Sequence, residues 1–253
     1  MAGISIQKKF FHLCFDNRNF QLLEHLFEVV DEKCLKNSEK IGIIIRFHYY
    51  SAEIQNVIQV YDKAINLLKP NLNGTSNGQT LLTHLCCRST RECMTEKQFV
   101  KYLLNRKDVD INKPDRYKNF PALQYLFLFN NDLNMDLVNL LVEHGADYNV
   151  CNKLGQTILH MMVKEGRFYN ESAVLVNTKY LLFRTNLDVG KKDNDGKTAL
   201  DLVEDKIKRE KEELANARTH QHTYYNPIPD LEKSIVVAEQ LRDVIKARVI
   251  EGV

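Results

Sequence analysis

Apolar residues recur at helical spacing along most of this 253-residue chain, in short blocks separated by polar segments. Residues 41–50 and 53–69 place their apolar side chains three or four residues apart, which predicts a pair of helices. Three later helical blocks end at residues 103–104, 140–141 and 181–182. A last block, from Leu231 to Val249, has apolar spacings of four, three, three, four and four residues. We therefore expect an all-α protein.

A second pattern, made of turn and cap residues, repeats between these blocks. Gly-Gln-Thr-Ile-Leu-His at 155–160 is matched by Gly-Gln-Thr-Leu-Leu at 78–82 and by Gly-Lys-Thr-Ala-Leu at 196–200. A weaker match, Asn-Phe-Pro-Ala-Leu, occupies 119–123, so the shared threonine or proline slots are 41, 36 and 41 residues apart. Glycine permits the positive φ of a tight turn, and threonine caps the helix that follows.

The Thr-x-Leu-His tetrapeptide at 157–160 and its spaced counterparts resemble ankyrin repeats, whose uninterrupted unit has about 33 residues. The resemblance covers most of residues 6–204 and is specific from about 78 to 203. It implies an ankyrin-repeat solenoid of stacked helix pairs with short β-hairpin loops, in which neighbouring units bury each other's apolar faces. We expect degenerate N-terminal ankyrin-like helix pairs at 1–72, ankyrin repeats at 73–204, and C-terminal helices that cap the array at 205–253.

The C-terminal segment departs from the repeat. Residues 203–218 are mostly charged and predict a long, largely solvated helix; a coiled coil is disfavoured because no heptad is sustained. Asp230 is placed to cap a final helix, and we expect its apolar stripe to pack on the open end of the array. The alternative is that this amphipathic helix docks a partner.

Composition and charge narrow the function. A formal net charge of +2 leaves no electrostatic footprint for nucleic acid or an anionic membrane. No apolar run approaches the ~20 residues of a membrane span, and residues 1–5 lack a signal-peptide core. We therefore expect a cytoplasmic protein, with the nucleus as an alternative. The Asn- and Lys-rich, Trp-free composition is similar to that of ankyrin proteins of poxviruses and intracellular bacterial pathogens, which act on host proteins; for such a protein the host cytoplasm is implied.

The chain offers little reactive chemistry. None of its six cysteines forms a Cys-x-x-Cys pair, and we expect buried thiols in a reducing compartment. The local group of His84, Cys86, Cys87 and Cys93 lacks the ligand spacing of a zinc site, so we expect no metal. No phosphate-binding glycine loop or convergent acid–base set is present, so we expect no cofactor and no enzyme activity. An enzyme that uses the loop from His220 to Tyr225 is the weaker alternative.

The function implied is non-catalytic recognition of another protein by a monomer, as an adaptor or an inhibitor, or as a pathogen protein acting on a host protein. A scaffold or oligomer that uses its last helix is an alternative. Ankyrin arrays bind through hairpin tips and exposed inner-helix positions, and aromatic and arginine side chains are the usual anchors. Carried onto this chain, the expected contact residues are Arg88, Arg116, Tyr117, Lys118, Tyr125, Phe129, Asn152, Lys153, Met161 and Lys164.

Overall fold

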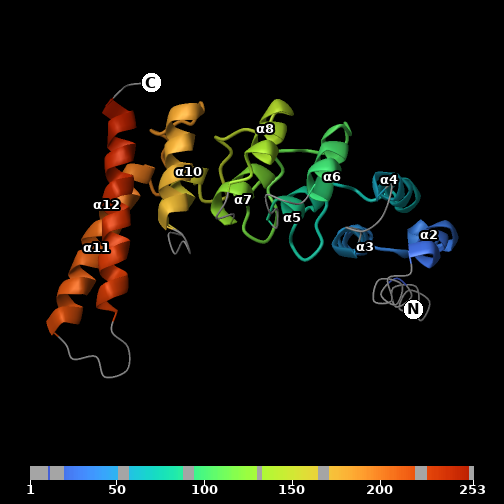
Figure 1. Ribbon diagram of the computed structural model, residues 1–253, viewed down its shortest axis with the longest axis horizontal. Coiled ribbons are helices and arrows are strands. Elements are labelled where there is room, and N and C mark those ends of the chain that lie inside the picture. Colours follow the sequence, from blue (N-terminus) through green and yellow to red (C-terminus); the bar gives the residue numbers. More distant parts are fainter. Residues whose placement is uncertain are drawn as a thin grey trace. The chain divides into compact units, whose positions relative to one another are not determined.

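A computed structural model describes residues 11, 20–50, 57–87, 94–129, 133–164, 171–219 and 227–250 (Figure 1). The chain divides into two compact units. Unit 1 comprises Met1–Leu126 and Asn134–Ala146, and unit 2 comprises Phe127–Leu133 and Asp147–Val253. In the described ranges the regular structure is helical, apart from one isolated antiparallel bridge between Ser76 and Gln79.

Unit 1 is built from successive helix pairs. Its elements are α2 (Phe20–Val29), the short 3₁₀ helix η1 (Glu32–Cys34), α3 (Asn37–Tyr50), α4 (Val57–Leu68), α5 (Leu81–Cys87), α6 (Met94–Leu104), the first part of α7 (Ala122–Phe129), and α8 (Met135–Glu143). Within a pair, α3 packs on α4 and α5 packs on α6. Between pairs, α4 packs on α2 and α6, and α6 packs on α8, so each helix row is continued from one repeat to the next.

Aromatic side chains fill the contact between α4 and α6. Tyr61 and Phe99 are both fully buried, and their rings stack with centroids 3.7 Å apart and planes 10° from parallel. Phe99 also lies 6.1 Å from the ring of Tyr102, one turn further along α6. Burying two such rings removes a large apolar area from water, which neither helix achieves alone.

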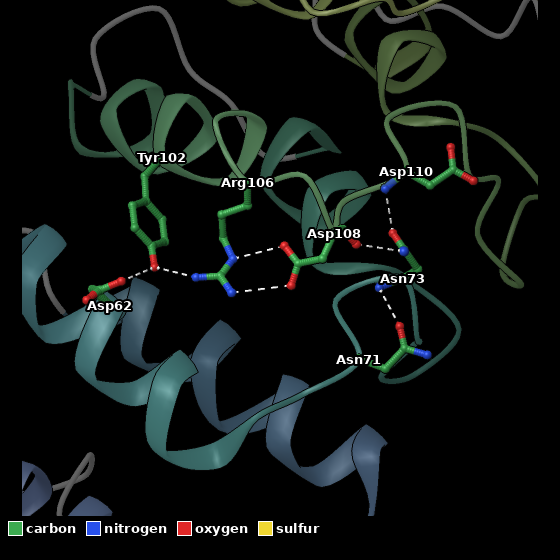
Figure 2. Close-up of polar contacts among 7 residues, drawn as sticks. All are labelled: Asp62, Asn71, Asn73, Tyr102, Arg106, Asp108 and Asp110. Carbon is green, nitrogen blue, oxygen red and sulfur yellow. Dashed lines mark hydrogen bonds and ion pairs between the residues drawn. The ribbon is translucent and has the colours of Figure 1, made fainter.

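A polar network borders this aromatic contact (Figure 2). The Tyr102 hydroxyl donates to Asp62 of α4 at 2.6 Å and accepts from Arg106 Nη1 at 3.1 Å. Arg106 also donates through Nε and Nη2 to the two carboxylate oxygens of Asp108, at 3.1 and 3.3 Å. Burial, helped by the carboxylate of Asp62, raises the pKa of Tyr102 to about 12, and the Arg106 guanidinium lowers the pKa of Asp108.

An asparagine side chain joins neighbouring repeats next to this network. Asn73 Nδ2 donates to the carbonyl of Asp108 at 2.9 Å, and Asn73 Oδ1 accepts from the N–H of Asp110 at 2.7 Å (Figure 2). One repeat later, Asn112 Nδ2 donates to the carbonyl of Gly145 at 3.0 Å. The amide thus pairs with backbone groups of the following repeat that would otherwise lack a partner within their own segment.

Unit 2 contains a further helix pair joined by an asparagine bridge, followed by two long helices. It contains α9 (Ile158–Lys164), α10 (Glu171–Arg184), α11 (Ala199–Thr219) and α12 (Ile228–Ile250). Asn149 Nδ2 donates to the carbonyl of Asn186 at 3.1 Å, and its Oδ1 accepts from the N–H of Asp188 at 2.8 Å. Helix α9 packs on α10 and α11, so the inner helices are also in contact.

The Thr-x-Leu-His tetrapeptide makes a second link between the repeats of unit 2. His160 Nδ1 accepts from the N–H and the hydroxyl of Thr157, at 3.3 and 2.8 Å. This leaves His160 Nε2 to donate to the carbonyl of Lys197 in the next repeat, at 3.0 Å. The expected capping role of Thr157 is thus carried out through His160, which fixes both the helix start and the following turn.

Helices α11 and α12 form an antiparallel hairpin, drawn in orange and red in Figure 1. Ile235, Ala238, Leu241 and Ile245 of α12 are buried, and α12 packs on α10 and α11. Three ion pairs of 2.6 Å follow at intervals of seven residues: Glu204 with Lys246, Lys211 with Glu239, and Arg218 with Glu232. Exposed pairs contribute only about 0–1 kcal/mol each, so the apolar seam stabilises the hairpin while the pairs favour one register.

The structure also qualifies two expectations for the C-terminal region. The expected boundary between residues 204 and 205 falls inside α11, which runs unbroken from the last inner-helix position into the cap. Leu82, Leu123, Leu159 and Leu200 occupy the same position of the repeated motif, which predicts one shared core slot. The first three are buried, but Leu200 is half-buried at the first turn of this long helix. None of the described helices has the length and apolarity that a bilayer crossing requires.

We predict that Leu159→Ala destabilises the fold by about 2–5 kcal/mol, because this side chain is 1% exposed and its loss leaves a cavity. Urea unfolding followed by circular dichroism measures the change. Leu154→Ala is the matched control: that leucine is 53% exposed, so its free energy of unfolding should stay within about 0.5 kcal/mol of the wild type. Equal stabilities of the two variants would contradict the packing described for α9.

We predict that Tyr102→Phe lowers stability by about 1 kcal/mol at neutral pH, and that this difference shrinks in strong alkali. The folded state keeps the phenolic proton up to about pH 12, whereas an unfolded tyrosine loses it near pH 10. The network therefore adds stability below about pH 10 that is lost as the pH rises toward 12. Urea unfolding at neutral and alkaline pH tests this, with exposed Tyr117→Phe as the control; a difference that does not change with pH would refute the assignment.

Candidate protein-binding surface

Four loops with a common construction precede the inner helices. In each, a backbone N–H near the start donates to a carbonyl near the end, over 2.8–3.0 Å: Ser76 to Gln79, Asp115 to Phe120, Asn152 to Gln156, and Asp193 to Lys197. In three of the loops the first residue is Asp or Asn, whose side-chain oxygen accepts N–H groups inside the loop. The expected short hairpin loops are thus tight turns organised by one central acceptor.

Asp115 organises the longest of these loops from a buried position, with 2% of its surface exposed. Its Oδ1 accepts from the N–H groups of Lys118, Asn119 and Phe120, at 3.0, 2.8 and 3.4 Å. Its Oδ2 accepts from the hydroxyl of Tyr125. A buried carboxylate is tolerated only when such donors surround it, so the loop and Tyr125 form one interdependent structure.

Tyr125 was expected to be an exposed contact residue, and this expectation is wrong. The side chain is 1% exposed, and its ring meets that of Phe120 edge-on at 5.9 Å. Burial, together with the neighbouring Asp115 carboxylate, raises the pKa of the phenol far above its ordinary value. Tyr125 therefore holds the loop in place from below and is not available to a partner.

Tyr117, at the tip of the same loop, is exposed as expected, with 66% of its surface accessible. The N–H of Arg116 donates to the carbonyl of Gly78 at 2.6 Å, which fixes the tip to the preceding loop. A Cβ at Gly78 would lie 3.1 Å from the Tyr117 Cβ, so only glycine allows this close approach without displacing the tip. Arg116 is exposed, and Lys118, which is half-buried, places its ammonium 5.8 Å from the centre of the Tyr117 ring.

In unit 2 the two loop tips are also joined. The N–H of Asn194 donates to the carbonyl of Leu154 at 2.9 Å, and its Nδ2 donates to the carbonyl of Lys153 at 3.0 Å. Gly155 has φ of +72°, and a Cβ there would lie 2.5 Å from Asn194 Oδ1. This joint leaves Lys153 and Leu154 exposed at the tip.

Three further expected positions have other roles. Asn152 is half-buried and accepts from the N–H groups of Leu154 and Gln156, at 2.9 and 3.0 Å, so it shapes the loop. Met161 was expected on the exposed helix face but is 5% exposed, and its sulfur accepts from Asn152 Nδ2 at 3.5 Å. The position of Asp193 in the last hairpin also predicts a tip residue, but Asp193 is buried. Burial raises its pKa, but the N–H groups of Lys197 and Asp195 outweigh this and lower it.

Of the remaining expected contact residues, one is exposed and the others are not described by the structure. Lys164, at the end of α9, is exposed. Arg88 lies outside the described residues, as do Cys14, Cys93 and the loop from His220 to Tyr225, and the side chain of Phe129 is not described. Leu154 is an exposed, large apolar tip residue that was not among the expected contacts. Its place between Lys153 and Gly155 in the turn is the signal that could have identified it.

The described residues show no assembly of catalytic or metal-binding groups. Cys86 is buried, while Cys87 and Cys151 are half-buried, and none of these three cysteines takes part in a disulfide. No cluster of three or more His, Cys, Asp or Glu side chains able to hold a metal occurs in the ranges searched. The surface described here therefore consists of rigid loops with exposed basic, aromatic and aliphatic side chains, suited to binding by contact.

Comparison with known proteins supports the fold. No protein-family model and no curated protein matches the sequence. The structure is similar to the crystal structure of EF0377, an ankyrin repeat protein, with a TM-score of 0.52 and 20% sequence identity. The similarity covers 78% of this chain and 91% of that one. The chain therefore has an ankyrin-repeat fold, which confirms the fold class expected from the repeated tetrapeptides.

We predict that Tyr125→Phe destabilises unit 1 by about 1–3 kcal/mol, because it deprives a buried carboxylate oxygen of its donor. Tyr117→Phe removes the same hydroxyl from an exposed ring and should leave the free energy of unfolding nearly unchanged. Urea unfolding of both variants makes the comparison. If both were as stable as the wild type, the Tyr125 hydroxyl would not be what holds the loop.

Proposed function

We propose that this protein recognises another protein, without catalysis, through the tips of its inter-repeat loops. The observation that carries the proposal is the combination of braced loops with exposed tips. Arg116 and Tyr117 in unit 1, and Lys153 and Leu154 in unit 2, extend from loops whose backbones are held by side-chain acceptors and by the neighbouring loop.

Such an arrangement favours tight contact. A partner that binds a loop already held in one conformation does not bear the entropic cost of ordering it. Aromatic and arginine side chains are the usual anchors of interfaces, and Tyr117 and Arg116 provide both on adjacent positions. The ankyrin-repeat fold supports the same class of function, because interaction is the general use of such arrays.

The last helix is the less favoured docking element. The apolar positions of α12 that would anchor a partner, Ile235, Ala238, Leu241 and Ile245, are already buried by contacts inside unit 2. A partner would have to separate α12 from its neighbours, at the expense of a packed apolar seam. The loop tips require no such rearrangement.

We further propose that the protein acts as a cytoplasmic adaptor or inhibitor, with the nucleus as an alternative location, and in a host cell if its source is a pathogen. It would act as a monomer with no cofactor. Gel filtration tests the monomer: the elution volume should not change between dilute and concentrated protein, whereas an earlier peak at high concentration would indicate self-association.

Site-specific photo-crosslinking tests the binding surface. Benzoylphenylalanine placed at position 117, and separately at position 153, should form reproducible adducts with the same protein in a cell lysate. The matched control places it at Lys179, an exposed position within α10 and not part of a loop, and should give no such adduct. Adducts formed only at position 179, or only at Val236 of α12, would contradict recognition by the loop tips.

A further inference from the structure

We propose that the loop Lys113–Lys118, called the basic loop below, binds an acidic and extended segment of the partner protein, with Tyr117 packed on an apolar residue of that segment. This inference rests on the proposed function and specifies the chemistry of the partner. Its evidence is the distribution of charge and exposure within the loop.

The basic loop carries more positive than negative charge on its surface. Lys113 and Arg116 are exposed, and Lys118 lies beside Tyr117. The one acid of the loop, Asp115, is buried, and its oxygens accept three backbone N–H groups and the Tyr125 hydroxyl. Its carboxylate is directed into the protein, so the exposed side chains of Lys113 and Arg116 give the loop surface a positive charge.

Two nearby segments of unit 1 contain one exposed acid between them. The neighbouring loop in unit 1 runs from Ser76 to Gln79 and contains no ionisable side chain. The nearest acid along the chain is Asp110, which is exposed and accepts the N–H of Asn112 through Oδ1 at 3.1 Å. The two exposed cations, Lys113 and Arg116, outnumber this acid. An excess of positive charge attracts acidic partners and speeds their association.

The geometry of Tyr117 adds an apolar contact to this charge. Its ring is two-thirds exposed, while its backbone is fixed through the Arg116 N–H to Gly78 and through the bonds of Asp115. A tyrosine held in this way loses little conformational freedom on binding and offers a large flat surface. The Lys118 ammonium, 5.8 Å from the ring centre, further restricts its orientation.

The size of the charged patch favours a protein segment over other anions. Proteins that hold duplex DNA through its backbone typically neutralise several phosphates, about 6–10 in strong binders. Anionic membrane surfaces are recognised by clusters of about 4–8 basic residues. The basic loop provides three, around an aromatic ring, which matches a few carboxylates flanking an apolar side chain.

A selection experiment tests the inference. Random linear peptides displayed on yeast are sorted against the full-length protein, and the selected peptides are measured individually by fluorescence anisotropy. We expect them to be rich in Asp and Glu around at least one bulky apolar residue. Tyr117→Ala should weaken their binding by about tenfold or more, Arg116→Glu should also weaken it, and added salt should reduce it further.

The control is the double variant Val176→Ala, Lys179→Glu on α10, which removes one exposed apolar residue and reverses one exposed lysine outside the loops. It should bind the peptides like the wild type. Because Tyr117 and Arg116 are exposed, their variants should keep the wild-type melting temperature, which separates lost binding from lost folding.

Several results would overturn the inference. One is a selection that yields no binders, or peptides without acidic residues; another is binding that Tyr117→Ala leaves unchanged. The inference also fails if phosphatidylserine vesicles or single-stranded DNA displace the selected peptides and bind the basic loop more tightly than the peptides do. The loop would then be a site for those anions. If peptides instead depend on Lys153 and Leu154, the inference fails while the proposed recognition by loop tips stands, and the crosslinking experiment decides that proposal separately.

Discussion

An asparagine amide spans the joint between successive repeats, and the positions of the loops depend on it. Asn73 and Asn149 each donate to one backbone carbonyl and accept from one backbone N–H of the repeat that follows. Each bridge is short, at 2.7–3.1 Å, and satisfies one donor and one acceptor of the main chain at once. A helix pair alone would leave its neighbour free to tilt, whereas the amide fixes the neighbour at the segment that leads directly into the loop.

The repeat itself could be predicted because its turn and helix-cap residues interact with residues close to them in the sequence. Thr157 and His160 stand three residues apart in the sequence, and the bonds between them depend only on that spacing. The second role of His160, donation to the carbonyl of Lys197, depends on a residue 37 positions away and on the stacking of two repeats. The asparagine bridges are of the same long-range kind: the motif that contains Asn149 is visible in the sequence, but the groups it joins are visible only in the fold.

The sequence predicted less well which side chains of the inner helices are exposed. Inner helices such as α9 span only two turns, so almost every side chain meets either the partner helix or the next loop; Met161 is buried for this reason. Tyr125 is aromatic, which suggests a residue that anchors a partner. Its hydroxyl instead donates a hydrogen bond to the buried carboxylate of Asp115, ten residues earlier. Tyr117, Arg116 and Lys153 were placed well because the tip of a tight turn has nowhere to be buried.

Gly190 stands where three earlier repeats carry an asparagine. Asn73, Asn112 and Asn149 occupy the third position of a segment that begins with Asn or Asp, and the corresponding residue after Asp188 is Gly190, which has no amide to offer. A duplicated unit inserted between Asn112 and Asn149 would find a bridging side chain on both sides. The same unit added after residue 190 would have none. One missing side chain thus distinguishes this joint from the earlier ones, and a single further loop separates it from α11, the first helix of the closing hairpin.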